Sequence, residues 1–396
     1  MEVYQNKNQC SGCTACMNSC PMNAILMLAD SEGFSYPQID SEKCTECGLC
    51  QMICPFHEGY PTDMNLHVPA VYAVKHIDYD IRMASSSGGM FTVLSDYILQ
   101  KHGVVYGAAF DHEFSVRHKK AETAQDRDRF RGSKYVQSDM GNIFQDVKAE
   151  LDRERNVLFT GTPCQIAGLK AFLGKKNYNS LIMCDLVCLG TPSPLIWKDY
   201  VSFLEKKKGC TLQSFNFRDK GQGWHTSRLC AQFTDGTLLY NTPIVDSFNS
   251  IFYQHIALRP SCHACVFTNF ERPSDITIAD FWGIENSKPE FDDNRGVSLV
   301  LVNTKKGEAV FEKVKDQLVY ETSNMDECRQ RHLTVPAEPS PKRNEFWHDY
   351  YEHGFEYVAK KYTEHGLVNR AKHQVLKPVM AKMGILDLAK ALLRRH

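Results

Sequence analysis

The sequence lacks an excess of charge of either sign. Its 46 lysines and arginines balance 47 aspartates and glutamates, which leaves a formal net charge of -1. Proteins that bind nucleic acid or an anionic membrane through charge carry a basic surface, because that surface attracts phosphate groups. The balance therefore argues against a charge-driven role on nucleic acid, and we expect no nucleic-acid partner.

Long apolar runs are missing as well. A membrane-spanning helix needs about 18 or more consecutive apolar residues, and no such run occurs. The N-terminal stretch MEVYQNKNQCSGC contains no basic region followed by an apolar segment, which a secretory signal would show. These absences predict a soluble, cytoplasmic protein without a transmembrane segment, and the length of 396 residues predicts two or three domains.

Cysteine, in contrast, is abundant, and half of the 16 cysteines form two quartets with one spacing. CSGCTACMNSCP (residues 10–21) and CTECGLCQMICP (residues 44–55) both read C-x2-C-x2-C-x3-C-P. In a reduced cytosol such thiols bind metal or do redox chemistry. Zinc usually takes two separated pairs, whereas this spacing is typical of iron–sulfur cubes, in which the fourth thiol reaches the other cluster of a pair. Zinc or free thiols are the alternative.

The two quartets are similar to those of bacterial two-cluster ferredoxins. This resemblance implies two [4Fe–4S] clusters and assigns four thiols to each. The first cluster takes Cys10, Cys13, Cys16 and Cys54, and the second takes Cys44, Cys47, Cys50 and Cys20.

Two glycine-containing loops follow in the second part of the chain. SSSGG (residues 85–89) opens a helix with an apolar face, and the free N–H groups of such a helix start can bind a phosphate. RGSKYVQS (residues 131–138) combines two cations with a glycine turn. A capped helix without a ligand is the alternative for the first loop, and a surface turn with solvated charges is the alternative for the second.

A further set of thiols comes from three separate turns. Cys164 stands in the first turn of a predicted helix, where the helix dipole stabilises a thiolate, so that it is a candidate metal ligand or nucleophile. Cys188 follows a predicted strand, and Cys262 and Cys265 form a C-x2-C pair. Four thiols could hold a third [4Fe–4S] cluster or a zinc ion, and two neighbouring clusters favour iron. Cys184 offers an alternative fourth thiol.

Five motifs resemble one known family: SSSGG, GSKYVQS, GTPCQIAGL, DLVCLGTPSP and CHAC followed by SDITIADFWG. Over residues 71–319 the chain resembles the β subunits of coenzyme F420 (deazaflavin) hydrogenases and dehydrogenases, a family that includes hydroxymethyl-chlorophyll reductases. The resemblance implies a non-Rossmann site for FAD, and a [4Fe–4S] cluster held by Cys164, Cys188, Cys262 and Cys265. It also places the flavin against Ser86, Ser87, Gly88, Gly89, Gly132, Ser133, Lys134, Tyr135, Gln137, Ser138, Gly161, Thr162 and Pro163.

The stretch FNFRDKGQGWHTSR (residues 215–228) supplies the candidate catalytic residues Arg218, Lys220 and His225. Cations beside an aromatic ring suit an acidic or planar ligand, and a histidine can relay a proton near neutral pH. The alternative is a β-hairpin, because the residues on both sides of the GQG turn have strand character.

We therefore expect a fold of the α+β or α/β class. A ferredoxin-like two-cluster domain (residues 1–58) and a linker (59–70) precede a mixed α/β flavin and iron–sulfur domain. That domain has an N-terminal part (71–150) and a C-terminal part with the third cluster (151–330). A helical, amphipathic tail (331–396) follows, and it docks on the body or a partner, or alternatively lies on a membrane surface.

The predicted function is that of an iron–sulfur flavoprotein oxidoreductase. Electrons pass between the clusters and FAD, and FAD exchanges hydride with a deazaflavin or another small organic substrate. The alternative is an electron-transfer subunit that serves a separate partner enzyme, and a metal-stabilised binding module is a third candidate. Both redox hypotheses expect a protein that donates or accepts electrons, such as a ferredoxin or a hydrogenase- or dehydrogenase-type subunit. Assembly into a homo-oligomer stays open.

Overall fold

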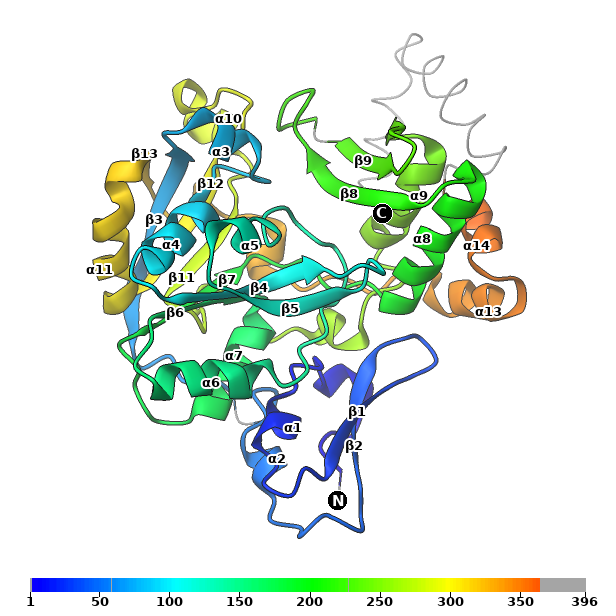
Figure 1. Ribbon diagram of the computed structural model, residues 1–396, viewed down its shortest axis with the longest axis horizontal. Helices are drawn as coiled ribbons and strands as arrows, with labels where there is room; N and C mark the ends of the chain where they lie inside the picture. The colour runs from blue at the N-terminus through cyan, green and yellow to red at the C-terminus, as the bar shows by residue number, and fades with distance from the viewer. Residues whose placement is uncertain (1, 58, 227, 364–396) are drawn as a thin grey trace. The chain divides into compact units, whose positions relative to one another are not determined.

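The computed structural model describes residues 2–57, 59–226 and 228–363 (Figure 1). The chain forms two compact units. The first comprises Met1–Leu195, Asn216–Arg228 and Leu258–Glu338, and the second comprises Ile196–Phe215, Leu229–Ala257 and the chain from Pro339 onward. The first unit holds all the predicted cluster cysteines.

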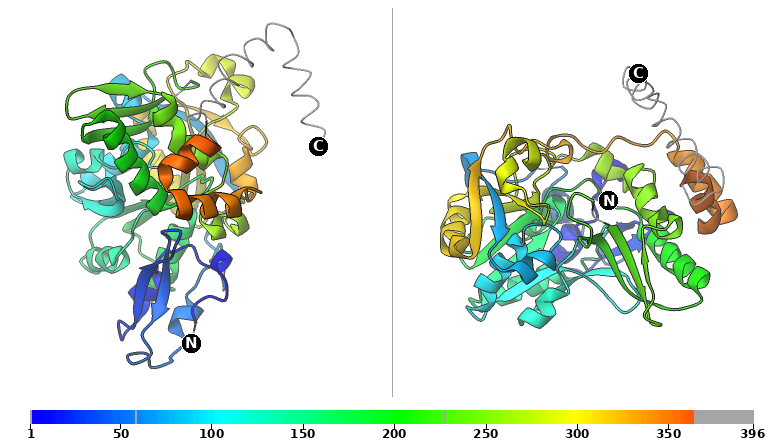
Figure 2. Two further views of the ribbon diagram at one scale, coloured as in Figure 1. Left: turned by 90° about the vertical axis from the view of Figure 1, so that its right-hand side faces the viewer. Right: turned by 90° about the horizontal axis from the view of Figure 1, so that it is seen from above.

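The first part of this unit has the ferredoxin pattern. Helices α1 (Ala15–Ser19) and α2 (Leu49–Met52) follow the two cysteine loops, and strands β1 (Ile25–Ala29) and β2 (Ser35–Ile39) pair antiparallel between them (Figure 2). Its small core joins two of the cysteines to apolar side chains, with Cys16 and Cys50 packed against Val3 and Ile25. A core of this size stabilises little by itself, so bound metal would contribute strongly to its stability.

The centre of the unit is an eight-stranded sheet with the order β13-β3-β12-β11-β7-β6-β4-β5. Strands β4 (Val104–Phe110), β6 (Val157–Gly161), β7 (Leu181–Leu186) and β11 (Ile276–Asp280) run parallel. Strands β5 (Val116–Ala121), β12 (Ser298–Thr304), β3 (Asn65–His76) and β13 (Leu318–Ser323) pair antiparallel to their neighbours. The central strands β6 and β12 are buried at every position, which explains their unbroken apolar sequences, while the edge strand β13 is mostly exposed.

Helices cover both faces of this sheet. On one face α4 (Met90–Leu99) and α11 (Lys305–Val314) pack against alternate residues such as Val105 and Leu158. On the other face α6 (Ile143–Asp152) and α7 (Pro163–Leu173) pack against the residues in between, such as Val104 and Phe159. Because side chains alternate between the two faces of a strand, each strand contributes residues to two separate hydrophobic cores. The predicted class, a ferredoxin-like domain and a mixed α/β domain, is confirmed.

Two local features differ from the expectation. Strand β3 begins at Asn65, within the segment predicted as a linker, and its pairing with β12 shifts register between Val302 and Thr304. Such an irregularity admits Pro69, which has no N–H to donate. The residues Ser85–Ser87 are good N-caps in the sequence, but the N-cap of α4 is Gly89, with a φ of 99°. The predicted domain boundaries stay predictions.

The second unit contains most of α8 (Pro194–Lys208), α9 (Pro243–Tyr253), α13 (Arg343–His353), α14 (Phe355–Tyr362) and part of a small sheet. Strands β8 (Leu212–Asp219), β9 (Arg228–Phe233) and β10 (Leu238–Tyr240) form that sheet, so the alternative of a hairpin around the GQG turn is present. Aromatic rings in edge-to-face contact fill the core of the unit, for example Trp197 and Phe248 with centroids 4.9 Å apart. The last part of the predicted helical tail, residues 364–396, lies outside the described residues. None of the helices that the structure describes has both the length and the apolar composition that a membrane crossing requires.

Candidate functional site

The first set of predicted ligands lines one pocket of the ferredoxin part. Cys10, Cys13 and Cys16 come from the loop that leads into α1, and Cys54 follows α2. Burial, with Cys10, Cys54 and Cys164 as neighbours, raises the pKa of Cys13 to about 12. Because clustered, buried thiolates need a compensating cation, this donor set fits a metal cluster.

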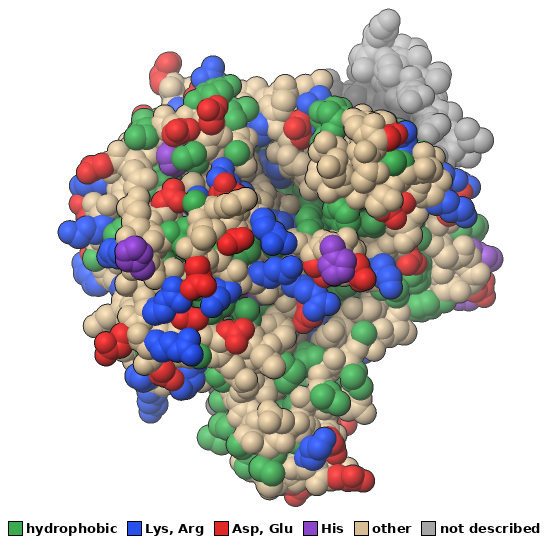
Figure 3. Space-filling view, viewed as in Figure 1, with side chains coloured by type: hydrophobic (Ala, Val, Ile, Leu, Met, Phe, Trp, Pro, Cys, Tyr) green, Lys and Arg blue, Asp and Glu red, His purple; other side chains and the backbone are tan. Residues whose placement is uncertain are grey.

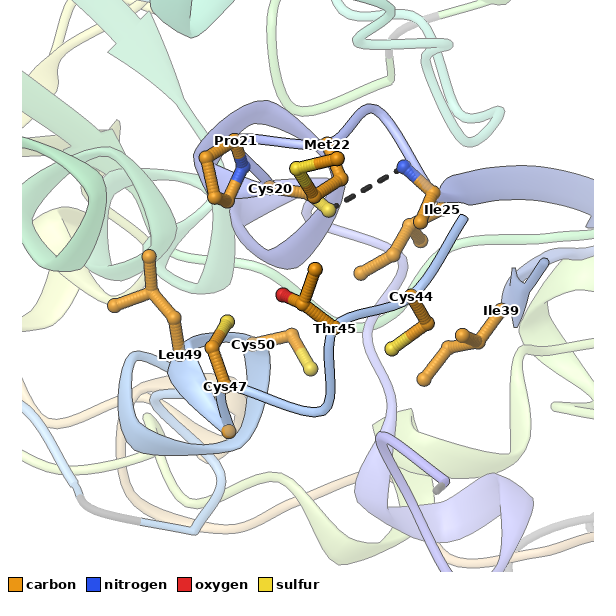
Figure 4. Close-up of a pocket in the computed structure, with 12 residues that line it drawn as sticks. Cys20, Pro21, Met22, Ile25, Ile39, Cys44, Thr45, Cys47, Leu49 and Cys50 are labelled. Carbon is orange, nitrogen blue, oxygen red and sulfur yellow. Dashed lines mark hydrogen bonds between the residues drawn. The ribbon is translucent and has the colours of Figure 1, made fainter. Parts of the chain in front are cut away.

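The second set lines another pocket, and Figure 4 shows its sulfur atoms around a common space. Its members are Cys20, Cys44, Cys47 and Cys50, so Cys20 lies with the second quartet and Cys54 with the first, as the ferredoxin resemblance implies. The N–H of Ala24 donates to the sulfur of Cys20 at 3.3 Å. The N–H of Glu46 donates to the sulfur of Cys44 at 3.4 Å. Such hydrogen bonds stabilise thiolate ligands.

A third set forms where three turns of the mixed sheet meet. Cys164 lies in the first turn of α7, Cys188 follows β7, and Cys262 and Cys265 lie in and directly after the short 3-10 helix Pro260–Ala264. Burial and the charges of the other three thiols raise the pKa of Cys188 well above its usual value. These four thiols are therefore brought together.

Cys184, the alternative fourth thiol, lies elsewhere. It is fully buried in the sheet core with Ile182 and Leu158, and its sulfur contacts the carbonyl oxygen of Asp185 at 3.8 Å. Burial raises its pKa, and the charged groups that act on it are Asp185 and Asp275 rather than other thiols. Strand β7 ends at Leu186, so the alternation that would place Cys184 and Cys188 on one side does not continue to Cys188.

The first and third sets are neighbours. The charge of Cys164 contributes to the raised pKa of Cys13, and burial raises the pKa of Cys164 itself. A Cβ atom on Gly168 would lie 2.9 Å from the sulfur of Cys13, so the ferredoxin loop lies directly against α7. Gly168 is thus required for this close approach.

The loops predicted to hold a flavin also touch one another. The N–H and the hydroxyl of Ser133 donate to the hydroxyl of Ser86 at 2.9 and 3.2 Å, which joins the SSSGG loop to the GSKYVQS loop. The side-chain amide of Gln165, in the capping box of Thr162 on α7, donates to Ser138 at 2.8 Å. The helix predicted to carry Cys164 is present, and it begins after Gly161 with Thr162 as its N-cap and Pro163 in its first turn.

Several residues of these loops pack against or hydrogen-bond to other parts of the protein. A Cβ on Gly88 would lie 2.2 Å from the carbonyl oxygen of Val74, so this glycine is needed for packing on β3. The amine of Lys134 donates to the carbonyls of Arg129, Arg131 and Gly132, and burial lowers its pKa to about 7. The hydroxyl of Ser87 donates to a carbonyl of the β12 loop, the ring of Tyr135 packs on Phe217, and Gln137 reaches the ferredoxin loop through the carbonyl of Ser11.

His118, in the edge strand β5, was not among the residues predicted from the sequence. Its Nε2 donates to the carbonyl of Thr160 at 2.9 Å, so its Nδ1 accepts from the hydroxyl of Ser138 at 2.9 Å. Burial lowers the pKa of His118 to about 4 and keeps the ring neutral. A histidine at an inward position of an alternating strand, VRHKKA, was the available signal.

We expect this buried histidine to make the protein sensitive to acid. Between pH 6.5 and about 4 the unfolded chain binds a proton at His118 and the native chain does not, so native stability falls as the pH falls. The loss is about 1.4 kcal/mol per pH unit in that window. Glutamine does not titrate, so the variant His118→Gln should not lose stability in this way. The difference in unfolding free energy between wild type and the variant should therefore be smaller at pH 5 than at pH 7, as measured by thermal denaturation. A constant deficit would contradict the assignment.

Of the three candidate catalytic residues, two lie close together. The amine of Lys220 donates to the carbonyls of Arg82, Ser87 and Arg295 at 2.6, 2.9 and 2.9 Å, beneath the SSSGG loop. Burial, followed by the charge of Arg82, lowers its pKa to about 7. The guanidinium of Arg218 pairs with Asp280 at 2.9 Å.

Two tryptophans accompany Arg218. Its guanidinium lies 4.9 Å from the ring centroid of Trp282, which stacks on Trp224 with an interplanar angle of 1°. His225, in contrast, lies at the surface with its Nε2 2.6 Å from Asp292. It shares this surface with Glu285, and the three offer ligand atoms within 4.8 Å of one another. The structure therefore groups Arg218 with Lys220, and His225 joins this group only through the ring of Trp224, at a centroid distance of 4.9 Å.

Two parts of the chain match families of known proteins. Residues 154–328 match the family described as the C terminus of the beta subunit of coenzyme F420 hydrogenase/dehydrogenase, and residues 9–57 match the 4Fe-4S dicluster domain. The coenzyme F420 hydrogenase subunit beta of Methanococcus voltae is 23% identical over 261 residues, which are 64% of this chain and 83% of that protein. A chain of the F420-reducing [NiFe] hydrogenase complex from Methanosarcina barkeri is 18% identical, with a TM-score of 0.46. The match covers 74% of this chain and 91% of that one.

Proposed function

Because the chain joins a 4Fe-4S dicluster domain to the C-terminal domain of the coenzyme F420 hydrogenase/dehydrogenase β-subunit family, we propose that it is an iron–sulfur flavoprotein oxidoreductase. In this proposal it holds three [4Fe–4S] clusters and one FAD, and it reduces or oxidises a deazaflavin or another small organic molecule. Clusters supply single electrons, and a flavin supplies the exchange of hydride. The observation that carries the proposal is the close approach of the ferredoxin loop to α7, where a Cβ atom on Gly168 would lie 2.9 Å from the sulfur of Cys13.

The spacing of the thiols supports iron–sulfur clusters over zinc. Zinc–sulfur bonds of about 2.3 Å in a tetrahedron bring the sulfur atoms to about 3.8 Å from one another. Among the described residues, no three thiols lie within 4.8 Å of one another in any of the three sets. An iron–sulfur cube is larger than a single ion and holds its thiolates further apart. The third set, Cys164, Cys188, Cys262 and Cys265, would thus hold a cube as well.

The residues around the SSSGG loop fit an anionic cofactor. Helix α4 begins at Gly89 with no side chain capping it, which leaves first-turn N–H groups as donors. A Cβ on Gly132 would meet no atom within 4 Å, so the neighbouring loop leaves space there. Ser86 and Ser133 would orient the cofactor, and Lys220 beneath Ser87 would hold a proton on its Nζ near neutral pH. Lys134 instead stabilises the turn in which it lies, through the hydrogen bonds of its amine to three carbonyl groups.

One observation favours the alternative of an electron-transfer subunit. Large apolar side chains are exposed around the second thiol set, and Figure 3 shows hydrophobic side chains over this part of the surface. Met22, Leu26 and Met52 are 47, 57 and 67% exposed, and Cys47 is exposed beside them. An apolar surface next to a cluster suits a protein that exchanges electrons. In this alternative the chain serves a partner enzyme.

Anaerobic purification with a cofactor count tests the proposal. We expect about twelve irons, about twelve sulfides and about one FAD per chain, as three cubes and one flavin require. The isolated chain should then reduce coenzyme F420, or another small oxidant from a screen, with a chemical electron donor. Activity that appears only with a partner protein would favour the alternative, and about eight irons with zinc and no flavin would contradict the proposal.

A further inference from the structure

Arg259 is a buried arginine without an acidic partner. It precedes the 3-10 helix that carries Cys262, and it is 1% exposed. Within the described part of the chain, no carboxylate oxygen lies within 4.0 Å of its guanidinium. A buried guanidinium stays charged, and burying that charge without a counter-charge is costly. The protein must therefore supply negative charge near Arg259 in another form.

The side chain of Arg259 points into the first thiol set. Its Nε donates to the carbonyl of Cys10 at 2.7 Å, and one terminal nitrogen lies 3.6 Å from the sulfur of Cys10. That same nitrogen donates to the carbonyl of Ser35 at 3.0 Å, and the other donates to the amide oxygen of Gln137 at 3.0 Å. The ring of Tyr36 lies 4.2 Å from the guanidinium carbon. Each nitrogen is occupied, and the sulfur is the partner that carries negative charge when it is a thiolate.

The backbone of Arg259 belongs to the third thiol set. Its carbonyl accepts from the N–H of Cys262 at 2.9 Å, and its own N–H donates to the carbonyl of Thr191 at 2.9 Å. One residue thus connects the sulfur of Cys10 with the turn that carries Cys262. The ferredoxin loop is shaped for it, because a Cβ on Gly12 would lie 2.9 Å from the guanidinium, and Gly12 has a φ of 69°.

We propose that Arg259 is the counter-ion of the cluster at Cys10, Cys13, Cys16 and Cys54, and that it raises the reduction potential of this cluster above that of the second. This inference rests on the proposed iron–sulfur function. Reduction adds one electron to a cluster that is already anionic with its thiolates, and a fixed positive charge with a hydrogen bond to sulfur stabilises the added charge. The pocket of the second thiol set has no lysine or arginine in its lining. The difference favours electron flow from the second cluster to the first, toward the third thiol set.

Redox titration followed by electron paramagnetic resonance tests this inference on the intact, cluster-loaded chain. In Arg259→Gln we expect one of the three cluster signals to become harder to reduce, by at least tenfold in its equilibrium constant, which is about 59 mV for one electron. The other two signals should stay in place. Arg259→Lys keeps the charge and should shift that signal by less than half as much.

The matched control is Lys7→Gln. Lys7 is a cation of the same region, 5.3 Å from the ring of Tyr36, but its side chain is 45% exposed and pairs with Asp30. Solvent screens its charge, so the titration curves should remain those of wild type. Equal shifts in Arg259→Gln and Lys7→Gln, or none in Arg259→Gln with full iron content, would overturn the inference and leave the proposed function intact.

Loss of iron is also informative. If Arg259→Gln loses about four irons, one cube, while Arg259→Lys retains them, the charge is needed to hold the cluster and the inference is supported. If both variants lose the same iron, the side chain acts by packing and the inference is overturned. Wild-type protein without clusters would instead contradict the proposed function itself.

Discussion

Under the proposed function, the variant Cys188→Ser is expected to lose about four irons per chain, the content of one [4Fe–4S] cube, and to slow the passage of electrons from the ferredoxin part to the proposed flavin. Cys188 lies among Cys164, Cys262 and Cys265, and a serine oxygen is a hard ligand that soft iron–sulfur sites disfavour. Changes to groups that only support a ligand cost about 10- to 100-fold, so loss of a ligand itself should slow flavin reduction at least about 100-fold. Iron analysis and stopped-flow reduction of the flavin by a reduced ferredoxin measure the two effects.

The control for this variant is Cys184→Ala, four positions earlier in the chain. Cys184 packs in the sheet core, so its removal leaves a small cavity and should destabilise the protein by about 1 kcal/mol. Its iron content and flavin reduction should equal those of wild type. The opposite pattern, with iron lost in Cys184→Ala and retained in Cys188→Ser, would assign the fourth thiol to Cys184.

The ferredoxin sites could be predicted from the sequence because their chemistry is local. Each quartet supplies three thiols from one loop of seven residues, and the exchange of Cys20 and Cys54 follows from two adjacent helices, α1 and α2. The third set is different, because its thiols come from turns up to about a hundred residues apart. Spacing in the chain does not show that they meet, so their positions at turns made them candidates only, and the resemblance to a family named them as one set.

The presence of a mixed α/β domain could be predicted from the sequence, but the bounds of its strands could not. Unbroken apolar stretches mark the central strands β6 and β12, since a strand buried on both faces has no polar side. The start of β3 was assigned to the linker, and the irregular pairing that admits Pro69 arises only from the partner strand β12. The composition of the second unit, with three separated segments, depends on tertiary packing alone.

Two functional candidates escaped the sequence reasoning for a common reason. His118 and Arg259 are single polar residues in otherwise ordinary contexts, an edge strand and the residue before Pro260. Their roles depend on distant partners, the Ser138 hydroxyl for the histidine and the Cys10 sulfur for the arginine. A buried polar residue can be recognised only when its burial is known.

The variant Arg272→Met should show the largest loss of stability, and it should also empty the third thiol set. Arg272 and Asp185 form a buried ion pair at 3.1 Å, with side chains 1 and 0% exposed. Removing one partner of such a pair leaves a buried charge and costs about 3 to 5 kcal/mol. Arg272 also donates to the carbonyls of Phe267 and Leu186, and it thereby joins the loop after Cys265 to the end of β7. Denaturant unfolding and iron content measure the two losses.

The dependence on pH distinguishes this ion pair from simple packing. Burial raises the pKa of Asp185, and Arg272 acts against that rise, so the pKa should be higher still in Arg272→Met. A carboxyl group whose native pKa exceeds its unfolded value binds a proton preferentially in the native state, so stability falls as the pH rises through that window. The loss of unfolding free energy in Arg272→Met, relative to wild type, should therefore grow from pH 5 to pH 8, and Asp185→Asn in the same chain should remove that growth.

The control variant Arg117→Met breaks a pair in which the arginine side chain is 54% exposed, and it should lower the free energy of unfolding by no more than about 1 kcal/mol. A deficit in Arg272→Met that is as small, or that is equal at both pH values, would show that the buried pair does not hold the two cysteine loops together.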